Sequence, residues 1–369
     1  MFTNYGRWVP ETPDPELLKL FSFTVFSKLE GAVTAGMIHL GDQLGLYAAM
    51  AGADGDTSGS LASRTELHER WVREWLHNQV AARIVSCDDL GANDPVFRLT
   101  PEAVAVLATP GHPAYGMGMF HRLPQTMGAL TRMPESFRTG IGHDYDSHGP
   151  EGAVGIERSF EPWNQNNMIP MVIPALEGIG AKLRAGASVA DIGCGAGGLA
   201  LLIGRTYPSS TVTGYDISRH ALERAAERLS EEGLGNVRFC DPRSEAIPQD
   251  GSLDLVCTFD CIHDMTHPTE MMHVIRRSLA DDGTWLLVDI KARDTLEENV
   301  GKNPMASLLY GISVLSCMSS AMSSPDGEGL GTLGLPESRA RAMAREAGFT
   351  RFRRLDIDHS VNAFYEIRP

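Results

Sequence analysis

The second half of the chain, from about residue 187, alternates short apolar runs with longer amphipathic segments. Such runs are typical of buried strands, and apolar positions at helical spacing predict helices between them. This alternation predicts a parallel sheet with helices on both faces and a closing hairpin. We expect strands at 188–192, 211–216, 237–240, 253–259, 284–290, 351–358 and 361–367. We expect helices at 198–206, 218–232, 269–279 and 336–347.

The first third of the chain shows a different pattern, in which apolar positions recur mainly at helical spacing. Short amphipathic turns are predicted at 15–21 and 23–29, and helices at 31–50, 61–66 and 68–84. Trp71 and Trp75 lie on one apolar face of the last of these. Two short strands, 84–88 and 96–100, flank a polar turn, and Pro101 opens a further helix. Helix, helix-turn-helix, two strands and helix is the order of a winged helix.

The two patterns predict two domains, which a chain of 369 residues can hold. We place a helical, winged-helix domain at 1–110 and the strand–helix domain at 159–369. Residues 111–158 between them are rich in Gly, Pro, Met and His and have no clear period. This composition favours a connector, or a lid helix around 117–133.

The winged helix could bind DNA, or it could serve as a dimerisation or substrate-capping module. Residues 33–110 hold five Arg against ten Asp or Glu, and the whole chain has a net charge of −15. DNA binding normally needs a basic face. We therefore expect the second role and no nucleic-acid partner.

The remaining composition bears on location and metal binding. The six cysteines include no C-x-x-C pair, so a zinc site is not expected. Residues 1–10 lack the basic and apolar stretches of a signal peptide. Segment 303–325 is uncharged but holds seven serines, which predicts a buried helix rather than a membrane span. We expect a cytoplasmic protein with reduced thiols, no metal and no membrane partner.

A glycine-rich turn follows the first strand of the second domain. Gly193, Gly195 and Gly198 fit the dinucleotide fingerprint G-x-G-x-x-G, and Asp216 ends the next strand, where a carboxylate can bind ribose hydroxyls. Asp191 stands where dinucleotide folds usually carry an apolar residue. A carboxylate there suits a positively charged ligand better than a pyrophosphate. A nicotinamide-dependent oxidoreductase is therefore the weaker alternative.

The run from Asp191 to Gly197, D-x-G-x-G-x-G, resembles motif I of class I S-adenosylmethionine-dependent methyltransferases. With its winged helix, the chain resembles bacterial small-molecule methyltransferases, related in layout to the caffeate-type O-methyltransferases. The resemblance implies an α/β, Rossmann-like seven-stranded domain preceded by a mostly α winged-helix domain, S-adenosyl-L-methionine as cofactor, and a homodimer. The implied cofactor contacts are Asp191, Gly193, Cys194, Gly195, Asp216, Ile217, Asp241, Pro242, Phe259, Asp260 and Trp163.

The stretch after the fourth strand, residues 259–268, resembles the His-Asp segment of those O-methyltransferases. In that family the histidine is the general base. The resemblance therefore implies His263 as the base, with Asp264 beside it to orient the ring. Met265 stands where the family usually has Trp, so the acceptor wall differs. The implied function is methyl transfer to a small-molecule acceptor, first of all a hydroxyl. A winged-helix regulator that senses S-adenosylmethionine or a metabolite is the alternative.

Overall fold

The computed structural model describes residues 12–369. The first eleven residues, which bear on the expected absence of a signal peptide, lie outside the described residues. The chain divides into two compact units, Met1–Ala103 and Val104–Pro369. The finer domain limits that we place at 110 and 158 stay predictions.

The first unit is helical and carries a small two-stranded wing. Its elements are α1 (Pro15–Gln43), α2 (Leu46–Ala51), α3 (Ser58–Thr65), α4 (Glu69–Ala81), β1 (Ser86–Cys87), β2 (Phe97–Arg98) and α5 (Pro101–Ala103). Strands β1 and β2 pair antiparallel, so the order is that of the predicted winged helix. Trp75 fixes α4 on α1, because its indole N–H donates to the Met37 carbonyl at 2.8 Å. Trp71, predicted on the same apolar face, is instead 78% exposed.

Helix α1 is continuous over 29 residues, where the sequence predicted two short turns and a separate helix. Asp14 caps it and Pro15 occupies its first turn, and no proline interrupts it afterwards. Its buried residues, Thr34, Ile38 and Gly41, all lie towards its C-terminal end. Its N-terminal part exposes large apolar side chains, namely Leu17, Leu18, Leu20, Phe21, Phe23, Val25, Phe26 and Leu29.

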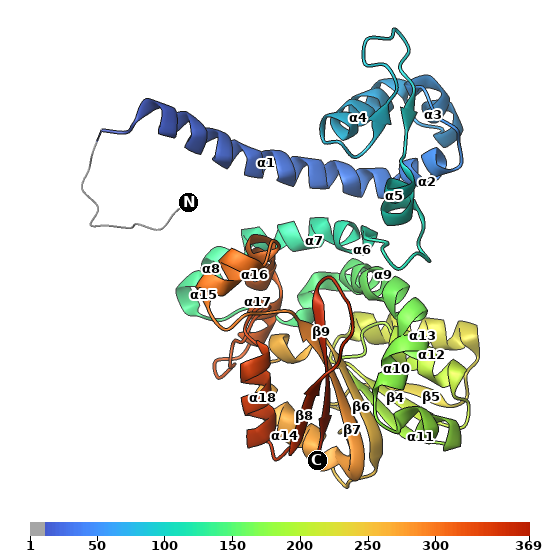
Figure 1. Ribbon diagram of the computed structural model, residues 1–369, viewed down its shortest axis with the longest axis vertical. Helices are drawn as coiled ribbons and strands as arrows, with labels where there is room; N and C mark the ends of the chain where they lie inside the picture. The colour runs from blue at the N-terminus through green and yellow to red at the C-terminus, as the bar shows by residue number, and fades with distance from the viewer. Residues whose placement is uncertain (1–11) are drawn as a thin grey trace. The chain divides into compact units, whose positions relative to one another are not determined.

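The second unit is built around a seven-stranded sheet in the order β5-β4-β3-β6-β7-β9-β8 (Figure 1). The strands are β3 (Ser188–Ile192), β4 (Thr211–Tyr215), β5 (Val237–Cys240), β6 (Leu253–Phe259), β7 (Leu279–Ile290), β8 (Arg351–Arg354) and β9 (Asn362–Arg368). Strands β3 to β7 pair in parallel, and β9 runs antiparallel between β7 and β8. This sheet confirms the predicted α/β class and the closing hairpin.

Helices surround the sheet and supply the walls beyond its carboxyl edge (Figure 1). They are α6 (Met117–His121), α7 (Leu123–Gly128), α8 (Met133–Thr139), α9 (Gly149–Asn167), α10 (Ile173–Ala175), α11 (Ile179–Ala185), α12 (Gly198–Thr206), α13 (Arg219–Glu232), α14 (Pro268–Ser278), α15 (Leu296–Lys302), α16 (Ala306–Leu315), α17 (Cys317–Ala321) and α18 (Glu337–Glu346). The connector showed no period because prolines at the starts of α7 and α8 divide it into short helices.

The uncharged segment 303–325 forms two helices, α16 and α17, where the sequence predicted one buried helix. The break is at Ser316, whose backbone leaves the helical conformation. Met305 and Leu308 are about half exposed. None of the helices within residues 12–369 combines the length and the apolar character needed to cross a membrane.

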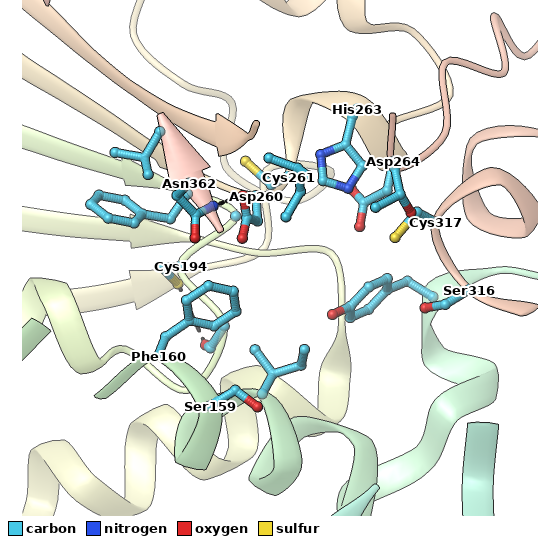
Figure 2. A pocket seen from close by; sticks show the side chains of 18 of the residues that line it. Ser159, Phe160, Cys194, Asp260, Cys261, His263, Asp264, Ser316, Cys317 and Asn362 are labelled. Atoms are coloured by element: carbon cyan, nitrogen blue, oxygen red, sulfur yellow. Dashed lines mark hydrogen bonds between the residues drawn. The ribbon is translucent and has the colours of Figure 1, made fainter. Parts of the chain in front are cut away.

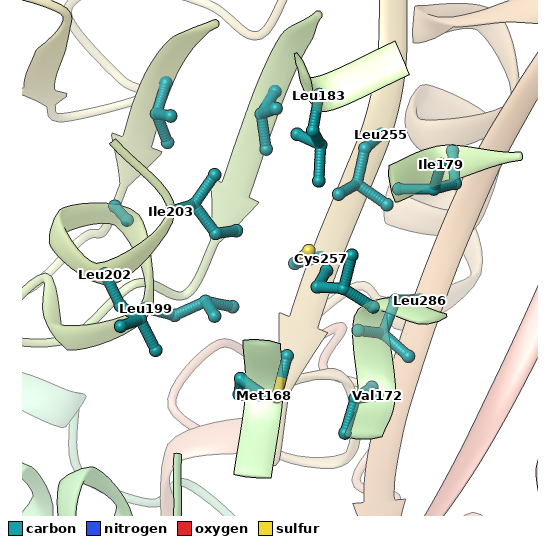
Figure 3. Packing of buried hydrophobic residues seen from close by; sticks show 14 of the residues in the cluster. Met168, Val172, Ile179, Leu183, Leu199, Leu202, Ile203, Leu255, Cys257 and Leu286 are labelled. Carbon is teal, nitrogen blue, oxygen red and sulfur yellow. The ribbon is translucent and has the colours of Figure 1, made fainter. Parts of the chain in front are cut away.

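Both faces of the sheet are buried, as the near-continuous apolar strands predict. Leu255 and Cys257 of β6 point into a cluster with α11 and α12, shown in Figure 3, and Val256 points into the opposite cluster with α14 and α18. Alternation along each strand therefore fills two cores at once. This double burial holds the strand ends rigidly, and those ends carry the residues described next.

Candidate active site

A left-handed glycine turn links β3 to α12. Gly193, Gly195 and Gly197 have φ angles of 72°, 54° and 78°, which glycine adopts without strain. A Cβ atom on Gly193 would lie 2.6 Å from the Cys261 Cβ, and one on Gly197 would overlap the Phe239 ring. No atom lies within 4 Å of a Cβ built on Gly195. The turn is packed behind Gly193 and Gly197 and open at Gly195.

A cavity of about 810 Å³ lies in the second unit, and Gly195 is one of the residues that line it. The carboxyl ends of β3, β4, β6 and β7 form one wall, and α9, the α16–α17 segment and residues 359–364 supply others. Most of the lining is apolar. Ligands of open α/β sheets bind beyond this edge of the strands. Figure 2 shows the side chains that face the cavity.

Two buried aspartates lie beside the glycine turn. Asp191 Oδ2 has no hydrogen-bond partner within residues 12–369. Asp216 accepts the backbone N–H groups of Gly195 and Ser218, each at 2.8 Å. Burial, and then the charge of Asp216, raises the pKa of Asp191 to about 7, and burial also raises the pKa of Asp216. A buried carboxylate with an unused oxygen suits a positively charged ligand group.

His263 lies on the short 3₁₀ turn Ile262–Asp264 that follows β6, and it is 2% exposed. Its Nδ1–H donates to Asp289 Oδ1 over 2.7 Å, and Asp289 is a buried residue of β7. Asp264, to which the sequence assigned the orienting role, does not make this bond. The parallel pairing of β6 with β7 brings Asp289 to the ring although it lies 26 residues along the chain.

On its other side the His263 ring meets Asp264 and Cys317, and one polar atom from each of the three lies within 4.8 Å of the others (Figure 2). Burial by itself lowers the pKa of His263, but the charge of Asp289, with contributions from Cys317 and from the Asp289 hydrogen bond, raises it well above 6.5. The Asp289 carboxylate therefore stabilises the imidazolium form of His263 relative to the neutral ring. The spacing of His263, Asp264 and Cys317 would also suit a metal ion. The absence of a metal therefore stays a prediction.

Family comparisons fit this geometry. Residues 183–327 match the family described as a methyltransferase domain, and residues 32–109 match the Rv2258c-like winged HTH domain. The chain contains a methyltransferase domain. This confirms the resemblance seen in the glycine motif, and the order of the two matches confirms the winged helix in front of it.

The methyltransferase domain also has curated relatives. The uncharacterized methyltransferase YcgJ of Bacillus subtilis is 34% identical over 110 residues, which are 30% of this chain and 43% of that protein. The methyltransferase GfsG of Streptomyces halstedii is 33% identical over 118 residues, 31% of this chain and 42% of that protein. The matched stretches span less than two thirds of either relative.

Solved structures share the fold over nearly the whole chain. Human N-acetylserotonin methyltransferase superposes with a TM-score of 0.68 at 15% identity and covers 98% of this chain and 99% of its own. The mitomycin 7-O-methyltransferase MmcR superposes with a TM-score of 0.67 at 21% identity, over 96% and 99%. At sequence identities this low, the superpositions establish a common fold and nothing further.

The second unit brings almost all of the predicted cofactor contacts to one cavity. The predicted contacts that line it are Asp191, Gly193, Cys194, Gly195, Asp216, Ile217, Pro242, Phe259, Asp260 and Trp163. Their contact with a cofactor stays a prediction. Trp163 stands on α9 with its ring 4.7 Å from that of His359, edge to face, and 5.3 Å from that of Phe364.

Asp241 is the exception among the predicted contacts, because it does not line the cavity. Its carboxylate accepts hydrogen bonds from Arg243 at 2.7 to 3.1 Å. The Arg243 hydrogen bond lowers the pKa of Asp241, which therefore stays ionised. Arg243 also donates to the Ile217 carbonyl at 2.6 Å, so the pair braces the turn behind the site.

Sequence reasoning missed three groups of the second unit. Asp289 holds His263 from behind, and Arg122 and Cys317 line the cavity. None of them lies in a recognisable motif. The one signal in the sequence was Asp289 itself, a carboxylate in the predicted strand 284–290. Parallel neighbouring strands end at the same edge of a sheet, so this carboxylate could have been expected near His263.

Proposed function

We propose that the protein transfers the methyl group of S-adenosyl-L-methionine to a hydroxyl group of a small, largely apolar acceptor, with His263 as general base. One observation carries the proposal. A single cavity is lined both by the buried Asp191, which has an unused oxygen, and by His263, whose ring Asp289 holds. The first suits the cofactor's positive charge, and the second can take a proton.

The residues of the cavity fit the proposed cofactor. Asp191 Oδ2 can accept a hydrogen bond from the ammonium group, and the open side of Gly195 leaves room for close approach. Asp216 and the half-exposed Ile217 stand at the end of β4, where a ribose can reach them. When bound, S-adenosylmethionine supplies an electrophilic methyl group on a sulfonium sulfur.

The protein's own part in the reaction is positioning and proton transfer. His263 removes the hydroxyl proton as the oxygen forms its bond to the methyl carbon and the carbon–sulfur bond breaks, which leaves S-adenosylhomocysteine. Asp289 holds the ring by Nδ1 and stabilises the imidazolium that forms. The apolar lining would exclude water and position the acceptor oxygen for its attack on the methyl group.

The experiment is incubation of the protein with S-adenosylmethionine and a library of hydroxylated metabolites, with S-adenosylhomocysteine as the readout. Parallel binding assays with NAD test the oxidoreductase alternative. Binding of NAD without binding of S-adenosylmethionine would contradict the methyltransferase proposal. The regulator alternative rests on the winged helix. Its helix α4 pairs Arg70 with Glu74 and Arg73 with Glu69, which leaves little free positive charge for DNA. Specific, salt-sensitive DNA binding in a gel-shift titration would favour that alternative.

Substitution of Asp191 or Asp216 by asparagine should weaken S-adenosylmethionine binding by about tenfold to a hundredfold. The reason is that a hydrogen bond to a charged group contributes about 1.5–3 kcal/mol. Because burial raises the pKa of Asp191 to about 7, a cation should bind more weakly at pH 6, where the carboxyl is protonated, than at pH 8. Calorimetry at the two pH values measures both effects.

A matched control for these variants is Asp254, which stands at the opposite end of β6 and pairs with Lys182 at 3.0 Å. Asp254→Asn should leave the affinity unchanged. Unchanged affinity in the Asp191 and Asp216 variants as well would mean that the cofactor binds elsewhere.

We also propose a homodimer in a reducing, cytoplasmic setting. The support for the compartment is that all six cysteines are free thiols. The support for the dimer is α1, whose N-terminal part exposes apolar side chains such as Phe23 (76%) and Phe26 (67%). Contiguous apolar surface of this kind marks a protein–protein interface.

Light scattering should therefore give twice the chain mass of 40.1 kDa. The double substitution Phe23→Glu and Phe26→Glu should shift the mass to that of a single chain, because two charges would be buried in the interface. Phe137→Glu on α8 replaces an equally exposed phenylalanine outside α1 and should leave the dimer intact. A wild-type protein that stays at 40 kDa at working concentration would contradict the proposal.

A further inference from the structure

Arg122 is a buried cation in the wall of the cavity. It lies between α6 and α7, is 5% exposed, and packs its Cβ against Gly155 of α9 so closely that no Cβ atom would fit there. Within residues 12–369 its guanidinium makes one hydrogen bond, from Nη2 to Ser316 Oγ at 3.1 Å, and no ion pair. Four other N–H groups of Arg122 thus have no partner among the described residues.

The second arginine that lines the cavity shows the contrast. Arg228 lies against two carboxylates, with Nη2 in contact with Glu161 and Nη1 3.7 Å from Glu157. Buried arginine side chains are rare unless they are paired, because removing a charge from water is costly. An arginine that is buried, unpaired and directed into a cavity therefore points to a ligand that brings the missing negative charge.

The surroundings of Arg122 do not supply that charge. Ser316 accepts from Arg122 and donates to His148 Nε2 at 3.0 Å. Burial, followed by the charges of Arg122 and Arg132, lowers the pKa of His148 to about 4, so the imidazole is neutral. The positive charge of Arg122 is consequently fixed by neutral neighbours and left for a ligand.

Arg122 lies near the chemistry as well. Ser316, which it holds, precedes Cys317, and Cys317 meets His263 in the same cavity (Figure 2). A ligand that reaches Arg122 therefore also lies along the wall that leads to the base. The same wall carries the apolar side chains of Met119, Met305, Leu308 and Ile312.

We propose that Arg122 binds a carboxylate of the methyl acceptor, so that the acceptor is an apolar hydroxy acid. This inference rests on the proposed function. Carboxylate is the fitting anion because a guanidinium binds it through two parallel hydrogen bonds. One unpaired guanidinium balances one negative charge, which a single carboxylate supplies.

The test compares acids with neutral analogues of the same shape. Hydroxybenzoic and hydroxynaphthoic acids, and their methyl esters, are titrated by calorimetry into the protein saturated with S-adenosylhomocysteine. The wild type should bind the best acid at least tenfold more tightly than its ester. Arg122→Met should lose this difference, and Arg122→Lys should keep part of it, because an ammonium group retains the charge but not the paired geometry.

Arg138→Met on α8 is the matched control, since that arginine is exposed and does not line the cavity. It should bind like the wild type. A melting curve and the affinity for S-adenosylhomocysteine show whether Arg122→Met is folded, and Arg122→Gln provides a second variant if it is not. Equal binding of acids and esters by the wild type, or no acid binding at all, would overturn the inference. If the wild type did not bind S-adenosylhomocysteine at all, the proposed function itself would be overturned.

Discussion

His263→Ala should lower turnover of a hydroxyl acceptor by about 10²–10⁴-fold and leave cofactor affinity unchanged, because a general base commonly contributes that much. The geometry gives the reason. One nitrogen of His263 is held by Asp289, and the ring lines the cavity that would receive the acceptor hydroxyl. Steady-state kinetics and calorimetry separate the two effects.

His273→Ala offers a control, because this histidine of α14 does not line the cavity. Treatment with a chelator should leave wild-type turnover intact, and activity that is lost and then restored by zinc would make His263 a ligand instead of a base. Undiminished turnover of His263→Ala would remove the base altogether. An acceptor that is already ionised would give only a small loss, so the variant also reports the class of the acceptor.

Asp289→Asn should lower the maximal rate by a similar factor and move the pH profile. The carboxylate raises the pKa of His263, and only the neutral ring can accept a proton. Wild-type activity should therefore rise with pH through a midpoint above 6.5. Without the carboxylate, burial disfavours the imidazolium, so the midpoint should move to lower pH. The rate should still fall, because the ring loses its orientation, as it does in the serine protease triad at a cost of about 10⁴.

The measurement is kcat/KM against pH for the wild type and for Asp289→Asn. Asp254→Asn again serves as a control, since Asp254 lies at the other end of the sheet. If the rising limb stayed in place in Asp289→Asn, another group would be the one that titrates. If the maximal rate were unchanged, orientation by Asp289 would be irrelevant to the chemistry.

The sheet could be predicted well because its strands are short, apolar and buried on both faces. The limits predicted for β3, β5 and β6 agree with those observed, since a polar or glycine residue lies at or beside each end. Helix α1 was harder. Its apolar residues have no single face to follow, because much of the helix is exposed, and the pattern therefore broke it into pieces.

The site could be predicted only where it is local in sequence. The glycine turn and Asp191 are contiguous, so their chemistry is visible in one motif. We predicted Asp264, the neighbour in sequence, as the residue that orients His263, because nothing in the sequence shows which distant carboxylate the sheet brings to the ring. The prediction that Trp71 lies on the apolar face was wrong for a related reason. Helical spacing places a residue on a face but does not show how much of that face is buried.

The depth at which His263 lies also orders the events of a catalytic cycle. With Asp289 behind the ring and the cavity in front of it, we expect a bound product to separate a proton on His263 from water. The proton would then reach solvent after the product has left. Each cycle would therefore end with a recharging step, in which departure of the methylated product restores the base for the next acceptor.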